Sequence, residues 1–300
     1  MKHISISLTL LWCSVHSFDT TRVLSNLPRR KAARAHLFVC KANQVGLYRE
    51  FVEHAWSELE EGGLLDGSDV EVPTLLAKNS AVAKGMPEGS QVKITVDAKS
   101  GKGPIAYGRF ALLETILPEN DRISTEGIQV MNLVLFGKPP LPVWGVDFVS
   151  LPGGKHLLAM DAQPMVVGSV PILNEKWKEW YDKHVNGKFE WGGDLPEPTR
   201  KYFSSHALWT RLSGDDTVQK IQTDVMTAFK EHLSLYLESC ATLDTQDVIS
   251  DGSNNNNHLE EYLEYRLQND PARPMLKSLY GQEWTEQVLS EILFPKERIL

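Results

Sequence analysis

One acidic residue of this sequence lies where burying a charge is costly. Asp147 stands in the run Val-Trp-Gly-Val-Asp-Phe-Val, between bulky apolar side chains. A carboxyl group there loses contact with water, which disfavours its charged form and raises its pKa. A raised carboxyl pKa suits a general acid working near neutral pH. A structural Asp held by backbone amides or by an arginine is the alternative, and the cost of burial favours function. Gly145, two residues earlier on the same strand face, leaves room beside Asp147 for a flat molecule.

Asn132 is the polar exception in a second apolar run, residues 128–136. That run is apolar on both faces after its second residue, as a central strand is. Asn132 should point the same way as Val130 and Val134, so its amide should be buried and must find hydrogen-bond partners. Taken alone, a structural hydrogen bond to a neighbouring loop explains this residue at least as well as a place in a binding site.

Arg266 and Asp270 are four residues apart and therefore share one face of a predicted helix. Asp270 precedes Pro271, where that helix should end. An acid at a helix C-terminus opposes the helix dipole and holds its proton more tightly. If Asp270 instead caps the next helix, the ionised form is favoured. The sequence leaves both arrangements open, together with an exposed Arg–Asp pair on a solvated helix.

The elements that must position these residues are visible in the apolar pattern. Short apolar runs separated by Pro, Gly and Asn predict strands at residues 105–117, 128–136, 143–151 and 155–163. Because residues 137–142 and 152–154 are short connections, adjacent strands should pair antiparallel. Helical periodicity covers residues 45–61, 177–181, 218–236, 259–266 and 282–293. Helices before and after the strands predict one α/β domain over residues 41–300, a three-layer α/β/α sandwich with a central antiparallel sheet.

Residues 1–40 have the composition of a targeting leader. A basic start and an apolar stretch from Ile4 to Val15 are the parts of a secretory signal. From Thr20 to Arg49 there are seven basic residues and no acid, which suits a transit peptide. The tandem order, with Phe18 after the expected cut, resembles the bipartite leaders of algae with complex plastids. We therefore expect a plastid protein; a disordered basic arm or a buried N-terminal strand is the alternative.

Composition excludes several kinds of function for the rest of the chain. After residue 49 there are 23 basic and 38 acidic residues, a net charge of −15, so no general nucleic-acid footprint exists. No apolar run is long enough to span a bilayer. Three cysteines without a CxxC spacing or a Cys/His cluster provide no metal or iron–sulfur ligands, and no nucleotide-binding glycine motif occurs. Redox chemistry would need electrons from another protein.

Two long segments carry a family resemblance. Residues 145–164, with Gly-Val-Asp-Phe-Val-Ser-Leu-Pro-Gly-Gly and His-Leu-Leu-Ala-Met-Asp-Ala-Gln-Pro, resemble the paired core strands of ferredoxin-dependent bilin reductases. Residues 262–281, beginning Tyr-Leu-Glu-Tyr-Arg-Leu-Gln-Asn-Asp-Pro, resemble a helical segment of the same family. Residues 202–211 match a further block. The resemblance extends from about Ile105 to Phe294 and is weak before residue 100.

The resemblance implies a reductase that holds an open-chain tetrapyrrole between its sheet and its C-terminal helices. It implies no bound metal or organic cofactor, single electrons from reduced [2Fe-2S] ferredoxin, and a radical on the bilin itself. Asp147 matches the sheet aspartate of the family and Asp270 the helix aspartate, which are its proton donors. Asn132 falls at a position linked to the bond that is reduced, and Arg266 matches a pocket arginine. Arg211 and Ser150 fall near propionate contacts, which suits guanidinium–carboxylate pairing.

The strings Leu-Pro-Gly-Gly, His-Leu-Leu-Ala-Met-Asp and Leu-Trp-Thr-Arg-Leu look most like the members that reduce the A-ring diene of 15,16-dihydrobiliverdin. Members that form phytochromobilin, phycourobilin or 15,16-dihydrobiliverdin are alternatives, as is a non-catalytic bilin carrier. We expect a monomer that binds ferredoxin, and an upstream reductase as a possible channelling partner. Ferredoxin is acidic, so docking would need a local basic patch such as Arg211, Arg266, Arg273 and Lys277.

Overall fold

The computed structural model of the chain describes residues 46–300 except 70–71, 120–122, 166–172, 196 and 244–251. The expected leader lies outside the described residues and stays a prediction. An eight-stranded antiparallel sheet runs through the described part, in the order β1-β3-β4-β5-β6-β7-β8, with β2 also pairing with β3. The strands are β1 (Leu65–Asp69), β2 (Lys78–Val82), β3 (Gln91–Gly101), β4 (Ile105–Ile116), β5 (Gln129–Gly137), β6 (Val143–Leu151), β7 (Lys155–Gln163) and β8 (Leu208–Ser213).

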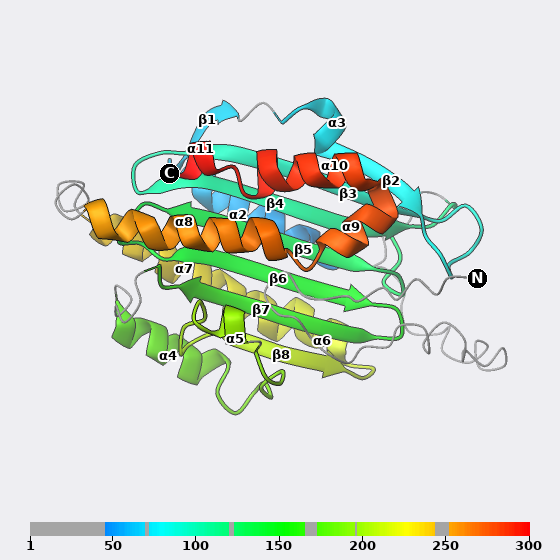
Figure 1. The fold of residues 1–300 in the computed structure, drawn as a ribbon. Coiled ribbons are helices and arrows are strands. Elements are labelled where there is room, and N and C mark those ends of the chain that lie inside the picture. Colours follow the sequence, from blue (N-terminus) through cyan, green and yellow to red (C-terminus); the bar gives the residue numbers. More distant parts are fainter. Residues whose placement is uncertain (1–45, 70–71, 120–122, 166–172, 196, 244–251) are drawn as a thin grey trace.

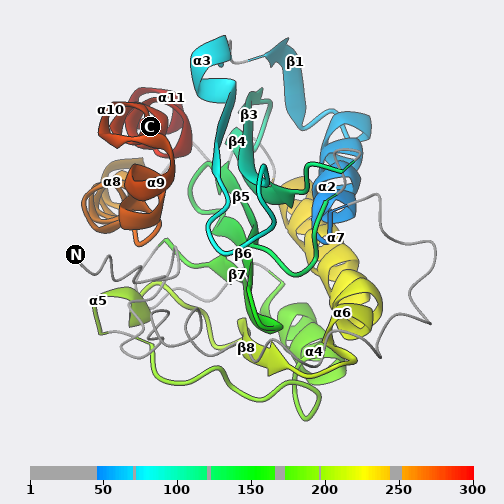
Figure 2. The ribbon, with the colours of Figure 1, turned by 90° about the vertical axis from the view of Figure 1, so that its right-hand side faces the viewer.

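Helices cover both faces of this sheet (Figures 1 and 2). One face carries α8 (Gly252–Asn269), α9 (Arg273–Tyr280), α10 (Gln282–Gln287), η3 (Val288–Leu293) and α11 (Lys296–Ile299). The other carries α2 (Arg49–Glu61), α4 (Asn174–His184), α6 (Thr217–Lys220), η1 (Ile221–Val225) and α7 (Met226–Thr242). The short helices α3 (Thr74–Ala77) and α5 (Glu197–Arg200) lie in connections. The predicted three-layer α/β/α sandwich is confirmed. Among the described residues no helix is both long and apolar enough to cross a membrane.

The central strands lie where the apolar pattern placed them. β6 and β7 match their predicted bounds, β4 ends one residue earlier than predicted, and β5 is shifted by one residue at both ends. The turn between β6 and β7 contains Gly153 and Gly154 at φ 87° and 69°. Only glycine adopts such positive φ values readily, so this pair sets the tight hairpin and its register. Leu151 consequently pairs with Lys155, and Asp147 with Ala159.

The sequence analysis did not predict the strands toward the two edges of the sheet, which are β1, β2 and β3 at one edge and β8 at the other. β3 alternates in burial, with Val92, Ile94, Val96 and Ala98 buried, and this period of two is a signal that could have identified it. β8 is only six residues long and pairs with β7 alone, so its local pattern is weak. The helix predicted over residues 45–61 begins four residues later, at Arg49.

The pleat of the sheet divides its side chains between two apolar cores. In β6, Val143 and Val149 pack with the C-terminal helices, whereas Trp144, Val146 and Phe148 pack with α2 and α7. Alternation therefore places the odd-numbered residues of β6 on the side of α8–α11. A shift of one position in the register would exchange the two sets, so burial on both faces fixes which residues each helical layer meets.

The core beneath α2, α4 and α7 is aromatic and contains a buried histidine. Trp144 donates its indole N–H to Nδ1 of His232 at 2.7 Å. The rings of Trp177 and Trp180 lie 4.7 and 4.4 Å from the His232 ring, between centroids. Burial lowers the pKa of His232 to about 3. His232 is therefore neutral in the folded protein at physiological pH, with its proton on Nε2.

This histidine should make stability depend on pH. Unfolded His binds a proton below its ordinary pKa of about 6.5, whereas folded His232 does not, so its contribution is lost as the pH falls below that value. Between about pH 7.5 and pH 5.5 that loss is about 1.4 kcal/mol. We expect His232→Gln to remove this part of the pH dependence in urea unfolding. His258→Gln, which removes a partly exposed histidine of α8, is the control. The same pH dependence in wild type and His232→Gln would contradict the assignment.

Candidate active site

Two neighbouring rows of residues across the centre of the sheet form the floor of the candidate site. The strand register places both rows on the face covered by α8–α11. One row contains Ala111, Asn132, Asp147 and Ala159, and the next contains Arg109, Val134, Gly145 and Asp161. Ala111 and Ala159 flank the polar pair of the first row, Val134 and Gly145 separate the two charged residues of the second, and Gly145 shares the face of Asp147 as predicted. The floor is therefore low in relief and carries four polar side chains.

Asn132 and Asp147 are direct cross-strand partners at the centre of this floor. Their relative exposures are 1% and 0%, so the predicted burial of both is confirmed. The chain reaches this arrangement because β5 and β6 are buried on both faces, which leaves no solvated side to receive a polar residue. A carboxyl group in such a place is costly unless its surroundings stabilise one protonation state.

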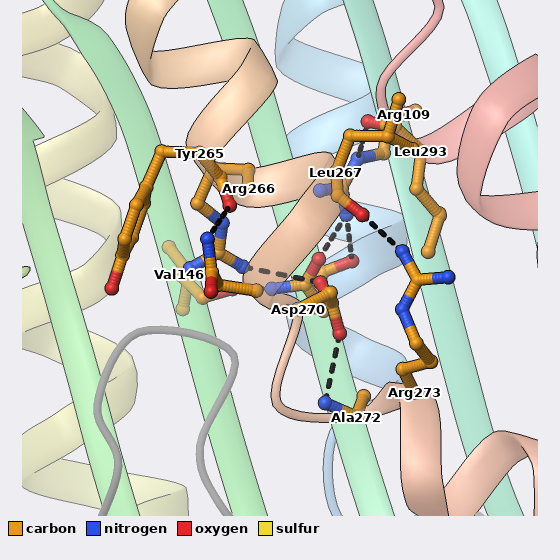
Figure 3. Close-up of polar contacts among 11 residues, drawn as sticks. Arg109, Val146, Tyr265, Arg266, Leu267, Asp270, Ala272, Arg273 and Leu293 are labelled. Atoms are coloured by element: carbon orange, nitrogen blue, oxygen red, sulfur yellow. Dashed lines mark hydrogen bonds and ion pairs between the residues drawn. The ribbon is translucent and has the colours of Figure 1, made fainter.

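Asp270 occupies the turn between α8 and α9, opposite the sheet. α8 ends at Asn269, and Oδ1 of Asp270 accepts the backbone N–H of Ala272 at 2.8 Å (Figure 3). Asp270 therefore directly follows α8, as the first arrangement expects. The alternative in which it caps the next helix is wrong, because the N-cap of α9 is Ala272 and Asp270 only accepts the N–H of that residue within the turn. Burial raises the pKa of Asp270, against the opposing effects of Arg266 and of the Ala272 N–H. Loss of water outweighs the local hydrogen bond, so the carboxyl group holds its proton more tightly than an exposed aspartate does.

Arg266 lies one helical turn before Asp270 and is buried with it. Its Nη2 is 3.4 Å from Oδ2 of Asp270, and the two residues are 4% and 3% exposed. The interpretation as an exposed Arg–Asp pair is therefore wrong. The guanidinium also lies over the ring of Phe294, 5.3 Å from its centroid. Arg266 is held by packing on the C-terminal segment as well as by its ion pair.

Arg109 is a site residue that sequence analysis missed. It lies on β4, is 0% exposed, and donates from Nη1 to Oδ1 of Asn132. Its Nε donates to the carbonyl oxygen of Leu293 at 3.2 Å, which ties the sheet floor to the C-terminal segment (Figure 3). Burial and the nearby charge of Arg266 lower its pKa to about 10, and Asp270 raises it. Arg109 therefore stays protonated at neutral pH and links Asn132 electrostatically to the Arg266–Asp270 pair.

Asp161 on β7 is a second buried acid on the floor and was also missed. Its Oδ1 accepts the hydroxyl of Ser204 at 2.5 Å, and its Oδ2 accepts the backbone N–H of Ser204 at 2.7 Å. Burial raises the pKa of Asp161 to about 7 despite these two hydrogen bonds. Asp161 thereby fixes the segment that follows Tyr202 and Phe203 against the sheet edge.

The other two expected substrate contacts lie apart from each other. Arg211 pairs with Leu157 across β7 and β8, so it faces the same side as Asp147, beside the Trp209 ring. Ser150 lies on the opposite face, where its hydroxyl bonds to Tyr48 and His156, each at 2.7 Å. Because Ser150 is three residues from Asp147, strand alternation turns it toward α2. A bilin between the sheet and the C-terminal helices would be on the other side from Ser150, so that assignment is corrected.

Aromatic side chains close one end of the site. A small cavity between α8, the end of β7 and the segment before Ser204 is lined by Gln163, Tyr202, Tyr262 and Arg266, among others. The Tyr202 ring lies 5.1 Å from that of Tyr262 and 5.6 Å from that of Tyr265. Flat rings of this kind suit contact with a conjugated planar molecule.

The structure does not arrange the residues suggested for ferredoxin docking into an exposed basic patch. Arg266 is buried, and both Arg273 and Lys277 pair with Glu286. Arg273 also donates to the carbonyl oxygen of Leu267. These three cations therefore make contacts within the C-terminal helices.

The arrangement can hold and deliver protons. Asp270 and Asp161 both have raised pKa values, and Asp147 is completely buried beside Asn132. Such acids can give a proton to a neighbouring atom when that atom becomes basic. Among the described residues, no three His, Cys, Asp or Glu side chains gather closely enough to hold a metal ion. The signal that would have found Arg109 and Asp161 is the one that identified Asp147, a charged residue within an apolar strand.

Comparison with known proteins gives consistent similarities. The model of the family described as ferredoxin-dependent bilin reductase matches residues 122–295. A phycoerythrobilin:ferredoxin oxidoreductase from Nostoc punctiforme is 30% identical over 275 residues, which cover 86% of this chain and 96% of that protein. One from Gloeobacter violaceus is 37% identical over 177 residues, covering 57% and 70%. The crystal structure of tomato phytochromobilin synthase in complex with biliverdin has a TM-score of 0.62 at 20% identity, over 82% of each chain. That last likeness concerns the fold.

Removing the positive charge of Arg266 should move the titration of Asp270. We expect Arg266→Met to raise the pKa of Asp270 further, because the guanidinium is the strongest effect opposing burial. The measurement is the pH titration of aspartate carboxyl ¹³C signals, with the Asp270 signal identified by its absence in Asp270→Asn. Arg273→Met is the matched control, since Arg273 has a weaker effect on Asp270. An unchanged or lower midpoint in Arg266→Met would show that the ion pair does not act on Asp270.

Proposed function

Because the chain belongs to the ferredoxin-dependent bilin reductase family, we propose that it reduces 15,16-dihydrobiliverdin to phycoerythrobilin at the A-ring diene. Its relatives at 30% and 37% identity are phycoerythrobilin:ferredoxin oxidoreductases, which supports this member of the family over the others. One observation carries the site assignment: Arg109 hydrogen-bonds both Asn132, the cross-strand partner of Asp147, and the carbonyl oxygen of Leu293 in the C-terminal helical layer.

In this proposal the protein contributes protons and orientation, and reduced [2Fe-2S] ferredoxin contributes single electrons. Two electrons and two protons added to the diene complete the reaction, with a radical on the bilin after the first electron. Asp147 gives a proton from the sheet floor and Asp270 from the helical side. Each then becomes a carboxylate, which the buried guanidiniums of Arg109 and Arg266 stabilise. Asn132 and Arg266 contact the bilin, and Arg211 pairs with a propionate carboxylate at the edge of the floor.

Two alternatives to this proposal remain: a reductase with another substrate or product, and a protein that binds a bilin without reducing it. Another reductase of the family would form phytochromobilin, phycourobilin or 15,16-dihydrobiliverdin on the same floor. A bilin carrier would use Asp147 and Asp270 only as hydrogen-bonding groups. The burial of both acids, and the raised pKa of Asp270 that follows from its loss of water, support the catalytic role.

The proposal also covers the localisation, the oligomeric state and the partners of the enzyme. Residues 1–40 are proposed as a leader to the plastid of an alga, which would be removed. The mature protein is proposed to act as a monomer. Its substrate must come from a reaction that reduces the 15,16 double bond of biliverdin, so an upstream bilin reductase is the proposed channelling partner.

The substrate is tested by offering biliverdin and 15,16-dihydrobiliverdin separately. With reduced ferredoxin and without oxygen, we expect 15,16-dihydrobiliverdin to give phycoerythrobilin, identified by absorbance and chromatography. Biliverdin should bind without yielding that product. Formation of another bilin would assign a different member of the family. A pigment that is bound but unchanged with every candidate bilin would support the carrier instead.

The proton donors are tested by replacing each acid with its uncharged isostere. We expect Asp147→Asn to reduce kcat by about 100-fold or more and to accumulate a bilin radical, because a positioned general acid contributes about that factor. Asp270→Asn should yield partially reduced products. Electron paramagnetic resonance and chromatography are the measurements.

Ser150→Ala is the matched control, since Ser150 lies three residues from Asp147 on the other face of the sheet. It should keep turnover close to that of wild type. Normal product formation by both Asp→Asn variants would remove these residues from the proton-transfer steps and leave them a structural role.

A further inference from the structure

The buried guanidinium of Arg109 has no counter-charge in direct contact. Among the described residues no carboxylate forms an ion pair with it, and its Nη2 has no hydrogen-bond partner. Its hydrogen bonds go to neutral oxygens, the Asn132 side chain and the carbonyl groups of Leu293 and Asn132. An unpaired buried cation costs stability, so the fold alone gives little reason for an arginine here.

The position of Arg109 sets the direction of the Asn132 amide. A guanidinium has five N–H donors and no acceptor, so only the Oδ1 end of Asn132 can meet it. Arg109 lies on β4, on one side of Asn132, and Asp147 lies on β6, on the other side. The amide nitrogen therefore points toward β6. Its only described hydrogen bond there is a long one, 3.5 Å to the carbonyl oxygen of Val146.

We propose that Arg109 is a positioning residue, which holds Asn132 so that its NH₂ group donates a hydrogen bond to a carbonyl oxygen of the bilin above Asp147. This inference rests on the proposed function. An open-chain tetrapyrrole has a lactam carbonyl group at each end, and negative charge reaches such an oxygen when an electron arrives before a proton. A fixed donor in a dry site stabilises that charge. Without Arg109, the amide could turn its oxygen toward the substrate and repel it.

A purely structural role for Arg109 can be distinguished by experiment from the proposed positioning role. Its contacts with Leu293 and with the Phe294 ring, 5.3 Å from Cζ, also secure the C-terminal segment. A structural role would act whether or not residue 132 carries an amide. The positioning role acts only through that amide, so the two variants should be strongly non-additive.

The test is a double-mutant cycle of Arg109→Met and Asn132→Leu, read as kcat with reduced ferredoxin and as the absorbance spectrum of the bound bilin. We expect Arg109→Met alone to reduce kcat at least tenfold with a smaller change in KM. In the Asn132→Leu protein, the same substitution should change kcat less than twofold. Equal losses in both backgrounds, or no loss in either, would overturn the proposal.

Two further variants cover the case in which Arg109→Met does not fold, as judged by thermal melting. Arg109→Lys keeps a charged group that only donates, so it should retain kcat within about fivefold of wild type. Arg109→Gln has an acceptor as well as donors, leaves the Asn132 amide free to turn, and should lose at least tenfold. Equal kcat values for the Lys and Gln variants would overturn the proposal.

The spectrum separates failure of this inference from failure of the proposed function. If wild type binds the bilin but does not reduce it, the function is wrong, while the cycle can still be read from the bound absorbance band. Arg109→Met and Asn132→Leu should then shift that band alike, and the double variant no further. If turnover is normal and the two shifts simply add, only the role of Arg109 is wrong.

Discussion

The structure depends on placing charged groups on a sheet face that a helical layer seals from water. Asp147, Arg109 and Asp161 lie on that face, and Arg266 and Asp270 meet it from the helices. Loss of water raises the pKa of the two acids Asp161 and Asp270 and lowers that of Arg109. Opposite charges held close together compensate part of this cost. The C-terminal helices must therefore pack accurately, because their carbonyl groups and side chains complete the surroundings of the buried charges.

The two faces of the sheet carry different kinds of side chain. The side of α2, α4 and α7 is filled by aromatic residues and a neutral His232, whose single described hydrogen bond joins it to Trp144. This packing makes β5, β6 and β7 a rigid floor. The side of α8–α11 carries the charged groups of the candidate site and the Asn132–Asp147 pair. Of the two proposed proton donors, Asp147 is held by a central strand and Asp270 by the buried turn between α8 and α9.

The chemistry of the family fits a site built in this way. A ferredoxin-dependent reductase receives electrons from another protein, so its own side chains need only bind the bilin, exclude water and hold protons. The raised pKa of Asp270 and the burial of Asp147 suit proton storage near neutral pH. In the proposed mechanism, the guanidiniums of Arg109 and Arg266 would stabilise the carboxylates that remain when the two acids give up their protons.

The sequence by itself determined the central strands, the sandwich and the burial of Asn132 and Asp147, since these follow from apolar periodicity and from the Gly153–Gly154 turn. It also determined the family, through two segments with specific residue order. It did not determine which neighbours those residues meet. Arg109 is 23 positions from Asn132 in the sequence, and Asp161 is 43 from Ser204, so only strand register and loop packing bring them together. Ser150 was assigned by resemblance, whereas its spacing of three residues from Asp147 along one strand already indicates the opposite face. The direction in which the pKa of Asp270 shifts was decided by how deeply the α8–α9 turn is buried.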